Sequence, residues 1–190
     1  MSNVKVSPID KSLVLIGFMG VGKTTIGEVV AKKLGRTFVD VDSEIEKEFN
    51  MSVPEIFESF GQETFRKVEQ RLTLKYCSEP GKVISLGGGA FLNEDIRNAC
   101  LANCIVFYLD LSWDTWEKDR YQKISDSRPM LQGLTSEQIK ELFNLRKPIY
   151  AIHHHKFPLD RFDAHQAADL IVDSVYEQIL NYIKSDFELS

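Results

Sequence analysis

Short apolar runs alternate with segments of helical periodicity along most of this chain. Residues 13–16 form a continuous apolar run that stops at Gly17, and residues 24–34 repeat apolar side chains at helical spacing before Gly35. This pattern is typical of a buried strand followed by an amphipathic helix. Three more strand-like runs span residues 37–41, 82–86 and 104–109. Further helical patterns span residues 44–49, 54–60, 63–76, 94–101 and 136–146.

The alternation predicts an α/β fold in which helices cover both faces of a parallel sheet. Helical segments are dense between the second and third strands, so residues of about 42–80 are predicted to form a substrate-binding insert. A polar stretch over residues 121–133 follows the fourth strand and its helix, and predicts a mobile loop. A length of 190 residues suits one domain over residues 1–190.

Charge and cysteine content narrow the class of protein. The net charge is -5 and the basic residues are scattered, which argues against nucleic acid as a partner. The three cysteines, Cys77, Cys100 and Cys104, are expected to be reduced thiols. The N-terminus lacks an apolar signal core, and no apolar run approaches the roughly 20 residues that span a bilayer. We therefore expect a cytoplasmic protein with no membrane partner, and a monomer because nothing marks a large apolar interface.

The segment from Gly17 to Thr24 fits the phosphate-loop pattern G-x-x-x-x-G-K-[ST] in full. Its glycines let backbone N–H groups point at phosphate oxygens, and the following helix adds a favourable dipole. Lys23 is predicted to sit between the β- and γ-phosphates of ATP, and the Thr24 hydroxyl to ligate Mg²⁺. The residues expected to contact the nucleotide here are Gly20, Val21, Gly22, Lys23, Thr24 and Thr25.

The motif alone fits GTPases, helicases, regulatory ATPases and small-molecule kinases. Little chain remains for a motor's second domain, and no N-K-x-D run for guanine occurs. Asp40 and Asp42 are expected at the end of the second strand, either on one face or at its exposed edge. A strand-end Asp followed by a helix-capping Asp is an equally good interpretation. Arg66 and Glu69 are three apart on a helix, where Glu69 can orient the guanidinium or form an ordinary surface pair.

Taken together, the motifs resemble those of the shikimate kinase family. The matching pieces, in order, are GFMGVGKTT, FVDVD, GQETFRKVE, ISLGGGA, RPML and RKPIY, and they run from Leu13 to Tyr150. The resemblance implies a P-loop fold like that of nucleoside monophosphate kinases, with a five-stranded parallel sheet and a lid over about residues 120–133. It also implies transfer of the γ-phosphoryl group of ATP to the 3-hydroxyl of shikimate, with Mg²⁺.

The resemblance also assigns roles to residues. Asp42 would bind the shikimate hydroxyls and orient or deprotonate the attacking one, and Asp40 would act in the magnesium shell. Arg66 and Arg146 would bind the carboxylate, which suits the planar guanidinium group. Gly88 and Gly89 would offer their backbone to the substrate. Lys23 and Arg128 would complete the catalytic set, with Arg128 reaching the phosphates from the lid.

The chain departs from the family where an arginine usually covers adenine. Arg120 is the nearest candidate, and Arg161 is a second one. Residues 153–155 are three consecutive histidines, which on a strand point to alternate faces and so are not expected to bind one metal ion.

Two other functions stay open. One is a gluconate or nucleotide kinase on the same core, and the other is a nucleotide-binding regulatory module without turnover.

Overall fold

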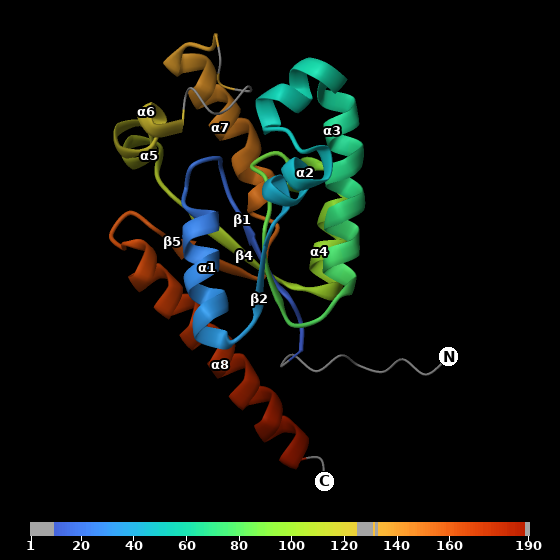
Figure 1. The fold of residues 1–190 in the computed structure, drawn as a ribbon. Helices are drawn as coiled ribbons and strands as arrows, with labels where there is room; N and C mark the ends of the chain where they lie inside the picture. Colours follow the sequence, from blue (N-terminus) through green and yellow to red (C-terminus); the bar gives the residue numbers. More distant parts are fainter. Residues whose placement is uncertain (1–9, 125–130, 132, 189–190) are drawn as a thin grey trace.

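A computed structural model describes residues 10–124, 131 and 133–188 (Figure 1). Five parallel strands form one sheet in the order β2-β3-β1-β4-β5, which confirms the predicted sheet. The strands are β1 (Leu13–Ile16), β2 (Thr37–Asp40), β3 (Lys82–Ser85), β4 (Ile105–Asp110) and β5 (His155–Pro158). β1 lies at the centre and is fully buried, as its uninterrupted apolar run predicts.

Helices cover both sides of this sheet. Figure 1 shows α1 and α8 on one side and α3 and α4 on the other, and each pair packs together. The helices are α1 (Lys23–Leu34), α2 (Val41–Phe49), α3 (Val53–Ser78), α4 (Glu94–Asn103), α5 (Trp113–Asp119), α6 (Tyr121–Ile124), α7 (Ser136–Tyr150) and α8 (Ala164–Glu188), with a 3₁₀ turn η1 (Ala90–Leu92). Within the described residues, no helix is both long and apolar enough to span a membrane.

The strand order determines where a ligand can bind. β1 pairs with β3 on one side and with β4 on the other, with Leu15 opposite Ser85 and Phe107. The loops that leave the carboxyl ends of β1 and β3 therefore start side by side. In open α/β sheets, ligands bind in the crevice outside these strand ends.

Two details of the helices differ from the sequence prediction. The helices predicted at residues 54–60 and 63–76 both exist, but they join into α3 around Gly61, whose φ of 77° and ψ of 164° kink the helix. The predicted strand of residues 37–41 stops at Asp40, because α2 begins at Val41. Asp40 is the N-cap of α2, and its carboxylate accepts a hydrogen bond from the Ser43 backbone N–H.

Candidate active site

The phosphate loop joins β1 to α1 with a backbone that requires glycine. At Gly17 the φ angle is 147°, and a Cβ atom there would lie 2.6 Å from the Leu109 carbonyl oxygen. Gly22 is the N-cap of α1 with a φ of 101°, and no side chain caps the helix. The first backbone N–H groups of α1 are thus available to phosphate oxygens, which favour helix N-termini.

Lys23 lies inside the curl of the phosphate loop. Its ammonium group donates hydrogen bonds to the carbonyl oxygens of Gly17 and Phe18, at 3.0 Å each. The side chain is buried, and these two hydrogen bonds supply the polar partners that a buried lysine needs. The loop therefore holds a positive charge at the position where the motif predicts phosphate binding.

Thr24 and Asp40 meet at the edge of the same loop. The Thr24 hydroxyl donates a hydrogen bond to Asp40 Oδ2 at 2.6 Å, although the two residues come from α1 and from the end of β2. A hydroxyl and a carboxylate are hard oxygen ligands, which Mg²⁺ prefers together with water and substrate phosphates. The donor set fits Mg²⁺, and the structure brings together the two residues that the sequence analysis assigned to it.

Asp42 occupies a different place from the one that the strand pattern predicted. It lies in the first turn of α2, because the strand ends two residues earlier. The expectation that Asp40 and Asp42 share a strand face was wrong, and the capping interpretation holds in part, because the residue that caps the helix is Asp40 and not Asp42. The Asp42 carboxylate lies against the loop after β3, where a Cβ atom at Gly87 would be 2.6 Å from Asp42 Oδ1.

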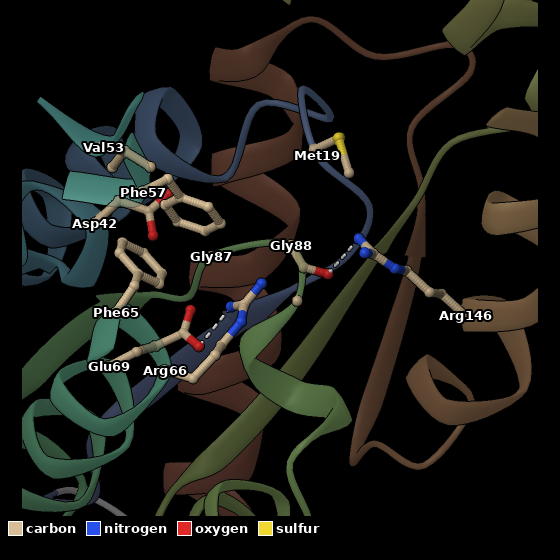
Figure 2. Close-up of a pocket in the computed structure, with 11 residues that line it drawn as sticks. Met19, Asp42, Val53, Phe57, Phe65, Arg66, Glu69, Gly87, Gly88 and Arg146 are labelled. Carbon is tan, nitrogen blue, oxygen red and sulfur yellow. Dashed lines mark hydrogen bonds and ion pairs between the residues drawn. The ribbon is translucent and has the colours of Figure 1, made fainter. Parts of the chain in front are cut away.

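A pocket of about 440 Å³ opens between α2, α3, α7 and the loop after β3 (Figure 2). One wall is apolar and aromatic, and the rings of Phe57 and Phe65 pack at 4.8 Å. Charged side chains from α2, α3 and α7, together with the backbone of residues 87–89, form a charged wall around the rest of the pocket. The lining residues are Met19, Asp42, Val53, Phe57, Phe65, Arg66, Glu69, Gly87, Gly88, Gly89 and Arg146.

Glu69 holds Arg66 in place at the charged wall. Arg66 Nη1 donates to Glu69 Oε2 at 2.6 Å, and the side chain of Glu69 is only 1% exposed. Burial raises the pKa of Glu69, and the positive charge of Arg66 acts in the opposite direction. Glu69 Oε1 has no hydrogen-bond partner among the described residues. Of the two roles left open by the sequence, the structure favours orientation of Arg66 over a surface pair.

Arg146 enters the pocket from α7 on the opposite side, as Figure 2 shows. It is 4% exposed, and its Nη1 donates to the Gly88 carbonyl oxygen at 3.1 Å. Its Nε has no partner within the described part of the chain. Burial lowers the pKa of Arg146, and the like charge of Arg66 acts in the same direction, while Tyr150 and Glu69 oppose it. The lining thus holds two guanidinium groups and two carboxylates, and the two guanidinium groups are its candidates for binding an anionic group.

A second pocket of about 750 Å³ lies over the phosphate loop. It is lined by Met19, Gly20, Gly22, Lys23, Thr24, Thr25, Asp40, Asp42, Ser85, Leu86, Gly87, Gly88, Arg120, Lys123 and Ile124. Four of these residues, Met19, Asp42, Gly87 and Gly88, also line the pocket with the two arginines. A ligand hydroxyl held by Asp42 would therefore face the phosphate loop directly.

Of the three arginines predicted to cover adenine or to act from the lid, one lines the pocket over the phosphate loop. Arg120 lines the pocket over the phosphate loop, together with Lys123 and Ile124 of α6, which the sequence analysis did not single out. Arg161 is exposed and is not among the lining residues. Arg128 lies outside the described residues, so its assignment to the lid stays a prediction.

The consecutive histidines are engaged in the sheet. His154 Nδ1 accepts a hydrogen bond from the Val106 N–H at 2.9 Å, and His155 stacks on Phe107 with ring centroids 5.2 Å apart. Neither of these two histidines lines either of the two pockets above. These contacts give the two imidazoles a structural role at the start of β5.

Comparison with known proteins gives one consistent family. The shikimate kinase family model matches residues 19–184. The chain is 52% identical to the shikimate kinase of Geobacillus thermodenitrificans and 50% identical to that of Bacillus subtilis, in each case over 87% of this chain and 89% of the relative. Among solved structures, the shikimate kinase of Acinetobacter baumannii in complex with shikimate aligns with a TM-score of 0.82 and 30% identity, covering 88% of this chain and 93% of the other.

Proposed function

The chain belongs to the shikimate kinase family, and we propose that it transfers the γ-phosphoryl group of ATP to the 3-hydroxyl of shikimate, giving shikimate 3-phosphate and ADP. The observation that carries this proposal is the shared boundary of the two pockets. Asp42 lines both of them, so one carboxylate faces an acid pocket on one side and a phosphate loop on the other. Transfer between two bound substrates requires this adjacency.

The acid pocket suits a small hydroxylated carboxylic acid. Arg66 and Arg146 are the positive groups of its lining, and guanidinium groups bind carboxylates in planar, bidentate geometry. Phe57 and Phe65 offer an apolar wall to the face of a carbon ring. Gly88 and Gly89 let Met19 and Arg66 approach the backbone closely at the edge of this pocket. We assign the substrate carboxylate to the two arginines and the hydroxyl groups to Asp42.

The reaction follows from these positions. Asp42 orients the acceptor hydroxyl and takes its proton as the oxygen attacks the γ-phosphorus, while the bond to the bridging oxygen breaks and ADP leaves. Lys23, whose side chain is buried, stabilises the negative charge that spreads over the transferred group. Phosphoryl transfer depends mainly on position and charge. The loop and Asp42 supply both.

Thr24 and Asp40 would hold Mg²⁺, Thr24 through its hydroxyl and Asp40 through water or directly. The ion would neutralise charge on the β- and γ-phosphates when it is bound. We assign Arg120 to the nucleotide because it lines the pocket over the phosphate loop. We also propose that Arg128 reaches the phosphates from the lid, which would exclude water and so prevent hydrolysis of ATP.

We also propose a monomer, which is supported by one chain's supplying both the acid pocket and the phosphate loop. Light scattering would test it as a mass near 21.7 kDa rather than twice that value. Cytoplasmic location is part of the same proposal. It is supported by three free, buried cysteines, which suit a reducing compartment.

A coupled assay of ADP release tests the substrate. Mg-ATP is supplied alone and with shikimate, quinate or gluconate, and initial rates are compared. Saturable release with shikimate, at a rate far above that with the other two acids, is the expected result. Release that depends on gluconate would move the acceptor assignment to the alternative kinase. Release that no acid stimulates would favour the regulatory module.

A further inference from the structure

A buried tyrosine shares its hydrogen-bond acceptor with an arginine of the acid pocket. Arg146 and Tyr150 are four residues apart on α7, so their side chains leave the same face of the helix. Arg146 donates to the Gly88 carbonyl oxygen at 3.1 Å, and the Tyr150 hydroxyl donates to the same oxygen. A carbonyl oxygen has two lone pairs, so these two donors saturate it.

The environment of Tyr150 keeps its hydroxyl a donor. The side chain is 2% exposed, and its ring packs against that of Tyr108 at 5.7 Å. Burial raises the pKa of Tyr150 to about 12, and Arg146 acts against this rise. The hydroxyl is therefore neutral and protonated near pH 7. As a donor it can keep its hydrogen bond to Gly88 while its oxygen also interacts with the Arg146 guanidinium.

Arg146 has two acceptors to choose from once an acid is bound. It donates to the Gly88 carbonyl, and it lines the pocket that would hold the substrate carboxylate. Turning its donors toward the carboxylate weakens or breaks the bond to Gly88. A half-buried carbonyl that loses its last protein donor costs free energy, which would be subtracted from the binding of the acid.

We propose that Tyr150 is a positioning residue for recognition of the acid: its hydroxyl keeps the Gly88 carbonyl satisfied and so releases Arg146 to bind the substrate carboxylate. The inference rests on the proposed function, because it assigns the carboxylate to Arg146. Tyr150 itself does not line the pocket. Its effect is therefore specific to ligands with a negative charge at the position that Arg146 reaches.

Tyr150→Phe removes the hydroxyl and keeps the ring. Calorimetry with shikimate and with its uncharged carboxamide measures the two dissociation constants, and the coupled assay measures KM and kcat. We expect the Kd and KM for shikimate to rise about tenfold, the cost of leaving the Gly88 carbonyl without a protein donor. The Kd of the carboxamide and the KM for ATP should change less than about twofold.

Tyr108→Phe is the matched control. Tyr108 is as well buried and contacts Tyr150, but its hydroxyl donates to Asp110 at 2.8 Å, away from Gly88. The Tyr108→Phe variant should leave the ratio of the Kd of shikimate to the Kd of the carboxamide at the wild-type value. If Tyr150→Phe does not stay folded at the assay temperature, Tyr150→Met lacks the same hydroxyl and is measured in the same way.

A double-mutant cycle separates this role from a structural one. In an Arg146→Ala background, Tyr150→Phe should add no further rise in the Kd of shikimate. A full tenfold rise there, or equal rises for acid and carboxamide in the single variant, would overturn the inference. Wild-type protein that fails to phosphorylate shikimate would instead refute the proposed function. Wild-type turnover with an unchanged Kd in Tyr150→Phe would refute only the role of Tyr150.

Discussion

Replacing Gly87 with alanine is expected to reduce catalysis strongly and to leave the fold intact. A Cβ atom at Gly87 would lie 2.6 Å from Asp42 Oδ1 and 2.9 Å from Glu69 Oε1. Ordinary contact begins at 3.4 Å, so the Asp42 oxygen would have to retreat by the difference, about 0.8 Å. The group displaced is the one to which we assign the acceptor proton.

The expected magnitudes differ for stability and for rate. The atoms that the new Cβ meets are the ends of two side chains, and Gly87 does not adopt a left-handed φ. We therefore expect the free energy of unfolding to change by no more than about 1 kcal/mol. A misplacement near 1 Å costs about 100-fold in rate. For about 0.8 Å we expect kcat to fall roughly 30- to 100-fold, with the Kd of ATP unchanged.

The assay combines kcat from coupled ADP release, the Kd of ATP from calorimetry and the melting temperature. Gly81→Ala is a control in the turn before β3, where φ is 72° and no atom lies within 4 Å of the added Cβ. Gly81→Ala should lower stability through backbone strain and leave kcat unchanged.

Gly89→Ala, whose Cβ would meet Arg66 Nη2 at 2.7 Å, should raise the KM of shikimate. A wild-type kcat in Gly87→Ala would refute the reasoning about Asp42.

Three further predictions concern single side chains. Asp42→Asn should keep the Kd of ATP and lower kcat about 100- to 10,000-fold, the usual contribution of a positioned base; near-wild-type turnover would remove Asp42 from the mechanism. Arg66→Ala should raise the KM of shikimate far more than that of ATP, whereas Lys67→Ala, which breaks an exposed ion pair with Glu63, should change neither; equal losses for both substrates would contradict the carboxylate assignment. Arg128→Ala should lower kcat in the same assay, and an unchanged rate would place the lid arginine elsewhere.

The features that the sequence predicted best are local in the chain. The phosphate loop needs only its own glycines, Lys23 and Thr24, which a contiguous motif specifies. The pairing of Arg66 with Glu69 follows from helical spacing. The strands β1 and β4 were recognisable because each is a short, buried apolar run, whereas the partly exposed β5 was not located.

Features that depend on tertiary contacts were not predictable in the same way. Arg146 and Tyr150 reach Gly88 across 58 and 62 residues, and no spacing in the sequence indicates such a contact. The period of a strand placed Asp42 wrongly, because Asp40 caps a helix that starts at the next residue.

The central claim is that a hydroxyl of shikimate receives the γ-phosphoryl group. Phosphorus NMR of the protein with Mg-ATP and shikimate follows ATP, ADP, inorganic phosphate and any phosphate ester in one sample. We predict that wild-type protein forms a phosphomonoester of shikimate that grows in step with ADP. In the Asp42→Asn variant, the ester should form far more slowly. ADP that accumulates with inorganic phosphate alone, and no ester, would contradict it.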